Sequence, residues 1–246
     1  MTHNQLVAIA LACGVTFAGS ASAQMTSTYA PINLYGCVLN DDSSWDDVAE
    51  LDKDLMNWMK KSDPSQSLWQ LTPQWRGAEG EFDLGYLGAW ESGKSMGEGM
   101  AAWTTSGREV AMAYGEKMEC SHSLMASMTV IEPATSPPGD GVIWFSECTL
   151  ADGATLKDAA AAHKAYGEAI TEKTGMESGG AWMFMPTLGT GDLEFDYYHV
   201  AGFDGYAALG SGFDAHFNED GWKAMGSAYD GVVSCTIPNV YDVKAM

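Results

Sequence analysis

The stretch WFSECTLADGATLKD, residues 144–158, holds the pattern that decides the fold. It has the form of a short apolar strand that ends at Cys148, followed by a turn and the start of a helix. Residues 34–47 repeat this form around Cys37. At an offset of 111 positions, Leu150, Thr155 and Asp158 fall on Leu39, Ser44 and Asp47. The chain is therefore predicted to be a tandem duplication.

The first copy predicts the element order β-α-β-β-α-β. A strand, INLYGCVL, is followed by the polar run DDSSWDD, in which Ser43 stands three residues before Asp46 and is the expected helix N-cap. Apolar residues spaced three and four apart then predict a helix that ends near Ser62. Two strand-like runs, 68–75 and 82–90, predict a hairpin. A second helical region, 97–118, leads to a last strand through residue 131.

The second copy repeats this plan after a linker, PATSPPGDG, at residues 133–141. Its hairpin is the best-matched part, since Trp69 falls on Trp182 and Pro73 on Pro186 at an offset of 113. We therefore expect a first repeat over residues 24–132 and a second over 142–246.

The first 23 residues have the form of a secretory signal peptide. An apolar run is followed by small residues and an Ala21-Ser22-Ala23 cleavage site. A lipid anchor on Cys13 is the weaker alternative, because Ala10 stands where a branched apolar residue is usual. No later segment has the length of apolar sequence that spans a bilayer. We expect an exported protein, periplasmic or extracellular, without a membrane span.

The chain is strongly acidic, with a formal net charge of -21 and a pI near 4.3. Nucleic acid and anionic membrane surfaces are therefore poor partners. The acids are spread along the chain and form no D-x-D-x-D-G calcium loop, which favours a solvated surface over a cation site.

Four cysteines follow the signal peptide, and an even number in an exported protein predicts two disulfides. Because Cys37 matches Cys148 and Cys120 matches Cys235, the economical pairing is Cys37 with Cys120 and Cys148 with Cys235. Zinc is the competing use of these residues, but there is no C-x-x-C, and no histidine stands at ligand spacing from a cysteine. We expect no metal.

The element order predicts an α+β fold in which each copy is a ferredoxin-like unit, a four-stranded antiparallel sheet with helices on one face. The bare face of such a sheet needs a partner. The duplication therefore resembles the dimeric α+β barrel superfamily, with its two halves fused in one chain as a pseudo-dimer. That superfamily includes small monooxygenases, lactone isomerases and haem-handling proteins, which hold ligands in the barrel or between helix and sheet.

Three residues are candidate catalytic groups: His199, Glu147 and Tyr197. His199 is an imidazole on an aromatic strand and corresponds to Tyr86 of the first copy, so it is either a haem ligand or general base, or a hydrogen-bonded core histidine. Glu147 is either a buried acid or base or an edge-facing carboxylate. His122, His163 and His216 show no ligand spacing with His199.

Aromatic side chains on the strands are the candidate ligand-binding residues, namely Tyr86, Trp90, Trp182 and Phe203. No phosphate loop or hydrolase motif is present. We therefore expect a protein that binds a small apolar or aromatic molecule between its repeats, with no cofactor and no obligatory catalysis. Two alternatives stay open: a cofactor-independent monooxygenase or isomerase, and an acidic structural or surface-interaction protein.

Overall fold

The structure is a computed structural model that describes residues 29–63, 65–77, 82–175 and 179–246. The expected signal peptide lies outside these residues. Among the helices of the described ranges, none combines the length and the apolar character needed to cross a membrane.

The first repeat contains four strands and three helices. The predicted second helical region is two helices, because the chain turns at Ser106 and Gly107, between α2 and α3. The elements are β1 (Tyr29–Leu39), α1 (Trp45–Ser62), β2 (Ser67–Trp75), β3 (Leu84–Ala89), α2 (Gly93–Thr105), α3 (Arg108–Lys117) and β4 (Met118–Ile131).

The second repeat has the same order, except that its last strand is interrupted. The break at residues 236–238 separates β8 from β9, which pair with successive parts of β5. The elements are β5 (Gly141–Leu150), α4 (Leu156–Thr174), β6 (Ala181–Leu188), β7 (Tyr197–Phe203), α5 (Tyr206–Phe217), α6 (Gly221–Tyr229), β8 (Val233–Cys235) and β9 (Asn239–Ala245).

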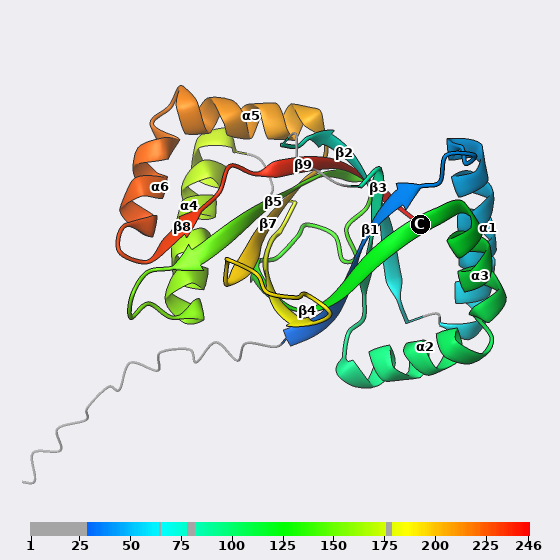
Figure 1. Ribbon diagram of the computed structural model, residues 1–246. Coiled ribbons are helices and arrows are strands. Elements are labelled where there is room, and N and C mark those ends of the chain that lie inside the picture. The colour runs from blue at the N-terminus through cyan, green and yellow to red at the C-terminus, as the bar shows by residue number, and fades with distance from the viewer. Residues whose placement is uncertain (1–28, 64, 78–81, 176–178) are drawn as a thin grey trace, which may run out of the picture.

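The two sheets close into one antiparallel barrel with the helices outside it (Figure 1). Each repeat has the strand order of a ferredoxin-like unit, with its first strand between its third and its last. Two seams join the repeats, because β2 pairs with β9 and β4 pairs with β6. The α+β fold, as a fused pair of ferredoxin-like units, is therefore confirmed.

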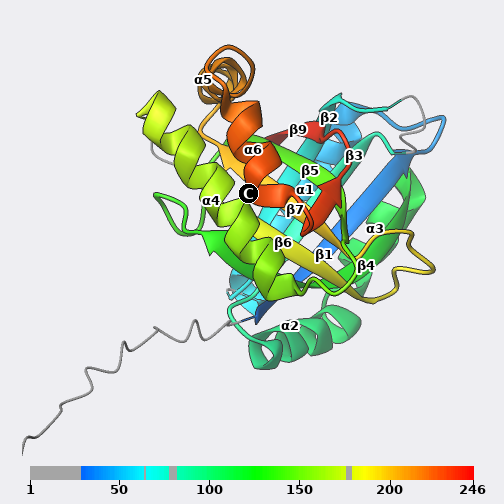
Figure 2. The same ribbon diagram turned by 90° about the vertical axis from the view of Figure 1, so that its left-hand side faces the viewer.

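Strands of this barrel are buried on both faces. Side chains of one parity point into the barrel, where Ile32, Trp69 and Tyr241 belong to one apolar cluster shared by both repeats. Side chains of the other parity face the helices, in a separate cluster for each repeat. Figure 2 shows α4 and α6 lying across the outer face of the second repeat's strands.

Helices α1 and α4 begin with equivalent capping boxes. The hydroxyl groups of Ser44 and Thr155 accept from the backbone N–H groups of Asp47 and Asp158, whose carboxylates accept from the cap residues in return. The predicted cap at Ser43 is therefore wrong by one residue. The duplication already pointed to the correct cap, because Thr155 falls on Ser44.

Both disulfides pair as predicted, Cys37 with Cys120 and Cys148 with Cys235. In each case the two cysteines are directly opposed on neighbouring strands, β1 with β4 and β5 with β8. Each disulfide therefore fixes the first strand of a repeat to its last. Such bonds are typical of an oxidising compartment.

Candidate functional site

A cavity lies inside the barrel, between the two repeats. Its volume is about 140 Å³, and both repeats and the linker contribute to its walls. An apolar cavity of about 150 Å³ is large enough to bind benzene. The lining is mostly apolar and includes Ile32, Trp69, Leu71, Leu87, Ala89, Ile143, Trp182, Phe184, Phe203 and Val243.

The linker between the repeats covers one end of this cavity. Pro133, Pro138 and Asp140 are among the linker residues that line it. Two hydrogen bonds hold the linker in place: Trp69 Nε1 donates to the carbonyl of Pro138 (2.9 Å), and the Ala245 N–H donates to Asp140 Oδ1 (2.8 Å). The linker is thus part of the site as well as a connection.

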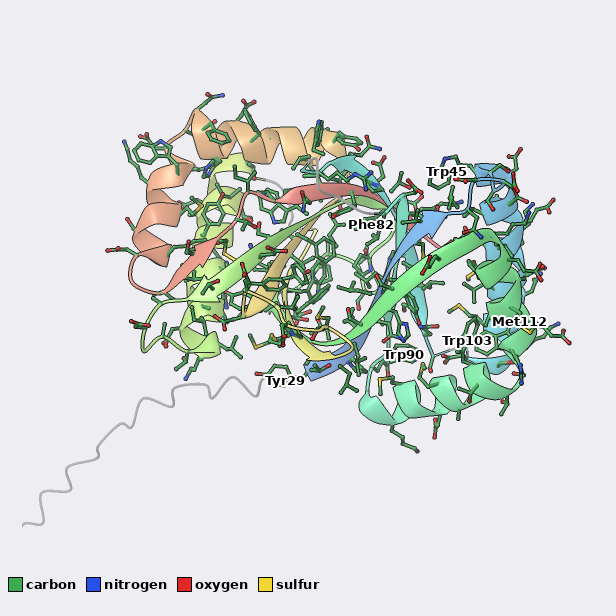
Figure 3. All side chains as sticks on the ribbon, viewed as in Figure 1. Tyr29, Trp45, Phe82, Trp90, Trp103 and Met112 are labelled. Atoms are coloured by element: carbon green, nitrogen blue, oxygen red, sulfur yellow. A yellow bond between two sulfur atoms is a disulfide. The ribbon has the colours of Figure 1, made fainter. Side chains whose placement is uncertain are left out.

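The structure brings two of the four expected ligand-binding residues to the cavity, Trp182 on β6 and Phe203 at the end of β7. Tyr86 faces the helices of the first repeat, in the cluster around α1. Trp90 lies near α2 (Figure 3), and its Nε1 donates to Asp63 Oδ2 at 3.0 Å. Tyr86 and Trp90 are therefore not among the residues that line the cavity.

Apart from this cavity, a cluster of polar side chains lies between the sheet and the helices of the second repeat. His163 on α4 stacks on His199, with ring centroids 3.8 Å apart and an 8° angle between the planes. Its Nδ1 bonds Tyr229 Oη at 2.7 Å and its Nε2 bonds Tyr197 Oη at 2.8 Å. A neutral imidazole has one N–H and one lone pair, so one tyrosine donates to the ring and the other accepts from it.

Burial keeps both imidazoles of this cluster neutral. It lowers the pKa of His163 to about 2, with a further contribution from the neighbouring His199. Burial also lowers the pKa of His199 to about 4. In addition, burial raises the pKa of Tyr197 and Tyr229 above the ordinary value. These groups are therefore neutral at neutral pH, and the cluster carries no charge.

The three candidate catalytic residues do not converge on one point. Tyr197 and His199 face the helix layer, whereas Glu147 has the opposite parity on β5 and is exposed. In the β5–β7 register His199 pairs with Ser146, and Glu147 pairs with Tyr198. The imidazole and the carboxylate are thus on opposite faces of the sheet.

His163 is not free to serve as an axial ligand of a haem. Both ring nitrogens of His163 are bonded to tyrosines, and His199 covers one face of its ring. The cavity described above lies on the other face of the sheet. Within the described residues, one group of ligand atoms comes close enough for a metal, Cys148, His163 and Cys235 within 4.8 Å of one another. Its two sulfur atoms are joined in a disulfide, so the thiolates that bind metals are not available.

The sequence interpretation missed part of the cavity wall. Trp69 is not among the predicted ligand-binding residues, although its match with Trp182 puts the two indoles on equivalent strands, and both line the cavity. Asp140 and Asp204 also line the cavity and are not among the predicted ligand-binding residues. The register of β5 and β7 brings them to the same end of the strand pair.

Comparisons with known proteins support the fold. No protein-family model matches the sequence, and neither does any curated protein. Among solved structures, a putative monooxygenase from Lactobacillus acidophilus matches with a TM-score of 0.55 at 12% identity, over 89% of this chain and 99% of that chain. A chlorite dismutase from Candidatus Nitrospira defluvii, in complex with imidazole, matches with a TM-score of 0.53 at 7% identity, over 88% and 91%.

A putative chlorite dismutase matches with a TM-score of 0.52 at 9% identity, over 89% of this chain and 95% of that chain. These similarities extend over nearly the whole of each protein. They show that the chain has the dimeric α+β barrel fold. At such identities they establish the fold alone.

Proposed function

We propose that this protein binds a small apolar or aromatic molecule inside the barrel, between its two repeats, without obligatory catalysis. The observation that carries the proposal is the apolar cavity of about 140 Å³ beneath the linker. Its walls include the indoles of Trp69 and Trp182, which offer flat surfaces for stacking. A ligand of about the size of a benzene ring with a short substituent matches this volume.

The geometry supports binding better than the two alternative functions. A carboxylate within hydrogen-bond reach of His199 would favour the monooxygenase or isomerase alternative, but Glu147 is on the opposite side of the sheet. The apolar cavity between the repeats favours a binding role over a purely structural one. Export, as expected from the N-terminal sequence, would place the protein where it meets small molecules outside the cytoplasm.

The proposal is tested by titrating benzyl alcohol, a neutral probe, into the mature protein and following the indole N–H resonances of the tryptophans by NMR. We expect saturable shifts for Trp69 and Trp182, the indoles that line the cavity. Replacing Ala89, a small residue of the cavity wall, by Phe should fill the space and abolish these shifts.

The matched control is Ala101→Phe, the same change at an exposed position of α2. It should bind benzyl alcohol like the wild type. Ala89→Leu, a smaller filling, provides a second test if the Phe variant does not fold. Circular dichroism shows whether Ala89→Phe is folded. If the folded variant binds benzyl alcohol as tightly as the wild type does, the proposed site is refuted.

A further inference from the structure

The rim of the cavity carries charge of one sign only. Among the described residues that line the cavity, the charged side chains are Asp140 and Asp204, and both are carboxylates. No lysine, arginine or histidine is in that lining. These two residues are therefore the formal charges that a ligand in the cavity meets.

The two carboxylates belong to the same edge of the cavity. Asp140 directly precedes β5 and Asp204 directly follows β7. In the register of these antiparallel strands Val142 is opposite Phe203, so the start of β5 lies beside the end of β7. A Cβ on Gly141 would be 3.7 Å from the Cα of Asp204, which shows how closely the two segments approach.

Nothing in the described structure neutralises this pair. The salt bridges of the described residues involve other acids: Glu98, Asp47, Glu168 and Asp220. Asp140 accepts one backbone hydrogen bond, from Ala245, through Oδ1. The charge of Asp140 and Asp204 is therefore available to a ligand at the rim, in a chain whose net charge is -21.

The aromatic walls favour the same sign. Trp69, Trp182 and Phe184 contribute aromatic rings to the cavity wall, whereas the ring of Phe203 lies against Gly212 of α5. The faces of aromatic rings carry a negative electrostatic potential that attracts ammonium groups. An anionic ligand would instead bring its charge close to two carboxylates, which is unfavourable. The walls and the rim thus discriminate in the same direction.

We infer that the cavity selects organic cations, molecules with a small apolar or aromatic body and one ammonium group, over acids of the same size. The inference rests on the proposed function, because it names the class of ligand for the same cavity. The apolar body lies among the tryptophans and the ammonium group lies at the rim, beside Asp140 and Asp204.

The test uses three probes with the same ring: benzylamine, benzyl alcohol and benzoate, titrated into the mature protein at low ionic strength. We expect benzylamine to bind about tenfold more tightly than benzyl alcohol, and benzoate to bind most weakly. The preference for the amine should shrink as salt is added, because mobile ions screen charges at a rim, while the affinity for the alcohol stays constant.

Two variants connect this preference to the rim, Asp204→Asn and Asp140→Asn. Each should lower the affinity for benzylamine several-fold and leave that for benzyl alcohol unchanged. Asp152→Asn is the matched control, since it removes one negative charge at the opposite end of β5. It should keep the full preference.

The outcomes separate the inference from the proposed function. If the protein binds benzyl alcohol, and binds benzylamine and benzoate with equal affinity, the inference is overturned and the proposed function stands. An equal effect of Asp152→Asn and Asp204→Asn would also overturn it, because the preference would then come from the net charge. Absence of binding by all three probes would overturn both.

Discussion

The same position in the two repeats holds a carboxylate in one and an imidazole in the other. In the first repeat, Asp52 on α1 accepts hydrogen bonds from the hydroxyl groups of Tyr86 (2.8 Å) and Tyr114 (2.7 Å) and from Gln70 Nε2 (3.0 Å). In the second repeat, His163 takes the place of Asp52 and His199 that of Tyr86. The duplication has therefore kept the location of a polar contact between helix and sheet while its chemistry changed.

This difference gives two equivalent clusters different chemistry. The first cluster is built around a carboxyl group that accepts three hydrogen bonds. The second is built around His163 and His199. Burial lowers the pKa of both imidazoles, so both are neutral at neutral pH. The last strand of the second repeat is also interrupted, since β8 and β9 stand in place of the single strand β4. Mild acid should therefore affect the second repeat first.

The largest expected effect comes from the disulfides. In the chain-entropy model, removing either one by Cys→Ser replacement of both partners costs about 4–5 kcal/mol, because the sequence separations, 83 and 87, are nearly equal. Urea denaturation at pH 7 measures this loss. The repeats should differ in hydrogen exchange, with lost protection concentrated in the three-residue β8 of the C148S/C235S variant. Equal protection in both double variants would remove this difference between the repeats.

Acidification should reveal the buried imidazoles. In the unfolded chain both histidines take up a proton near pH 6.5, whereas in the folded protein their pKa values are about 2 and about 4. The unfolded state thus binds more protons below pH 6.5. The free energy of unfolding should fall by about 4 kcal/mol between pH 6.5 and pH 4.5, as measured by urea denaturation.

His199→Tyr, which introduces the residue of the first repeat, is the variant that sharpens this comparison. It should remove roughly half of this fall in the free energy of unfolding, since one titrating imidazole remains at the cluster. Wild type and variant share the same carboxylates, so the protonation of these groups cancels in the difference between the two proteins. A free energy of unfolding that does not change down to pH 4.5 would contradict the assignment of buried, neutral imidazoles.

The carboxylate cluster of the first repeat should be sensitive to truncation instead. Asp52→Ala removes the acceptor of three hydrogen bonds and should cost about 3 kcal/mol, with Asp52→Asn costing less because one acceptor oxygen is kept. Thermal and urea denaturation measure both. Should Ala and Asn prove equally harmless, within about 0.5 kcal/mol of wild type, the cluster would have no role in stability.

The smallest expected effects are at the helix caps, where the two repeats should behave alike. Ser44→Ala and Thr155→Ala should each cost about 1 kcal/mol, because each removes the acceptor of a backbone N–H at the start of a helix. Ser43→Ala is the control, since the side chain of Ser44 makes the cap. A cost at Ser43 equal to that at Ser44 would contradict the observed capping boxes.

The fold could be predicted from the sequence because the duplication and the cysteine matches are direct evidence of repeated elements. Element ends were harder to predict. Ser43 and Ser44 are equally good caps by residue type, and the match of Ser44 with Thr155 in the second repeat is the sequence feature that favours Ser44. The division of each second helical region into two helices, and the break between β8 and β9, depend on tertiary contacts that the periodicity does not record.

The candidate site was predictable only in part. The alternation of a strand puts Tyr197 and His199 on one face of β7, but it does not tell which face lines the barrel when both faces are buried. Tyr198 and Val200 have the interior parity. The stack of His163 on His199 joins residues of α4 and β7, and it depends on how the helix docks on the sheet. No local pattern encodes that contact.

The most direct test of the account is where a small aromatic ligand binds. The cavity has a competitor on the surface, because Phe213 and Phe217 are exposed on α5, with exposed fractions of 60% and 58%. Isotope-filtered NMR of the mature protein with benzyl alcohol detects nuclear Overhauser effects between ligand ring protons and individual side chains. We predict such effects to Trp69, Trp182 and Phe184. Effects confined to Phe213 and Phe217 would contradict a binding site between the two repeats.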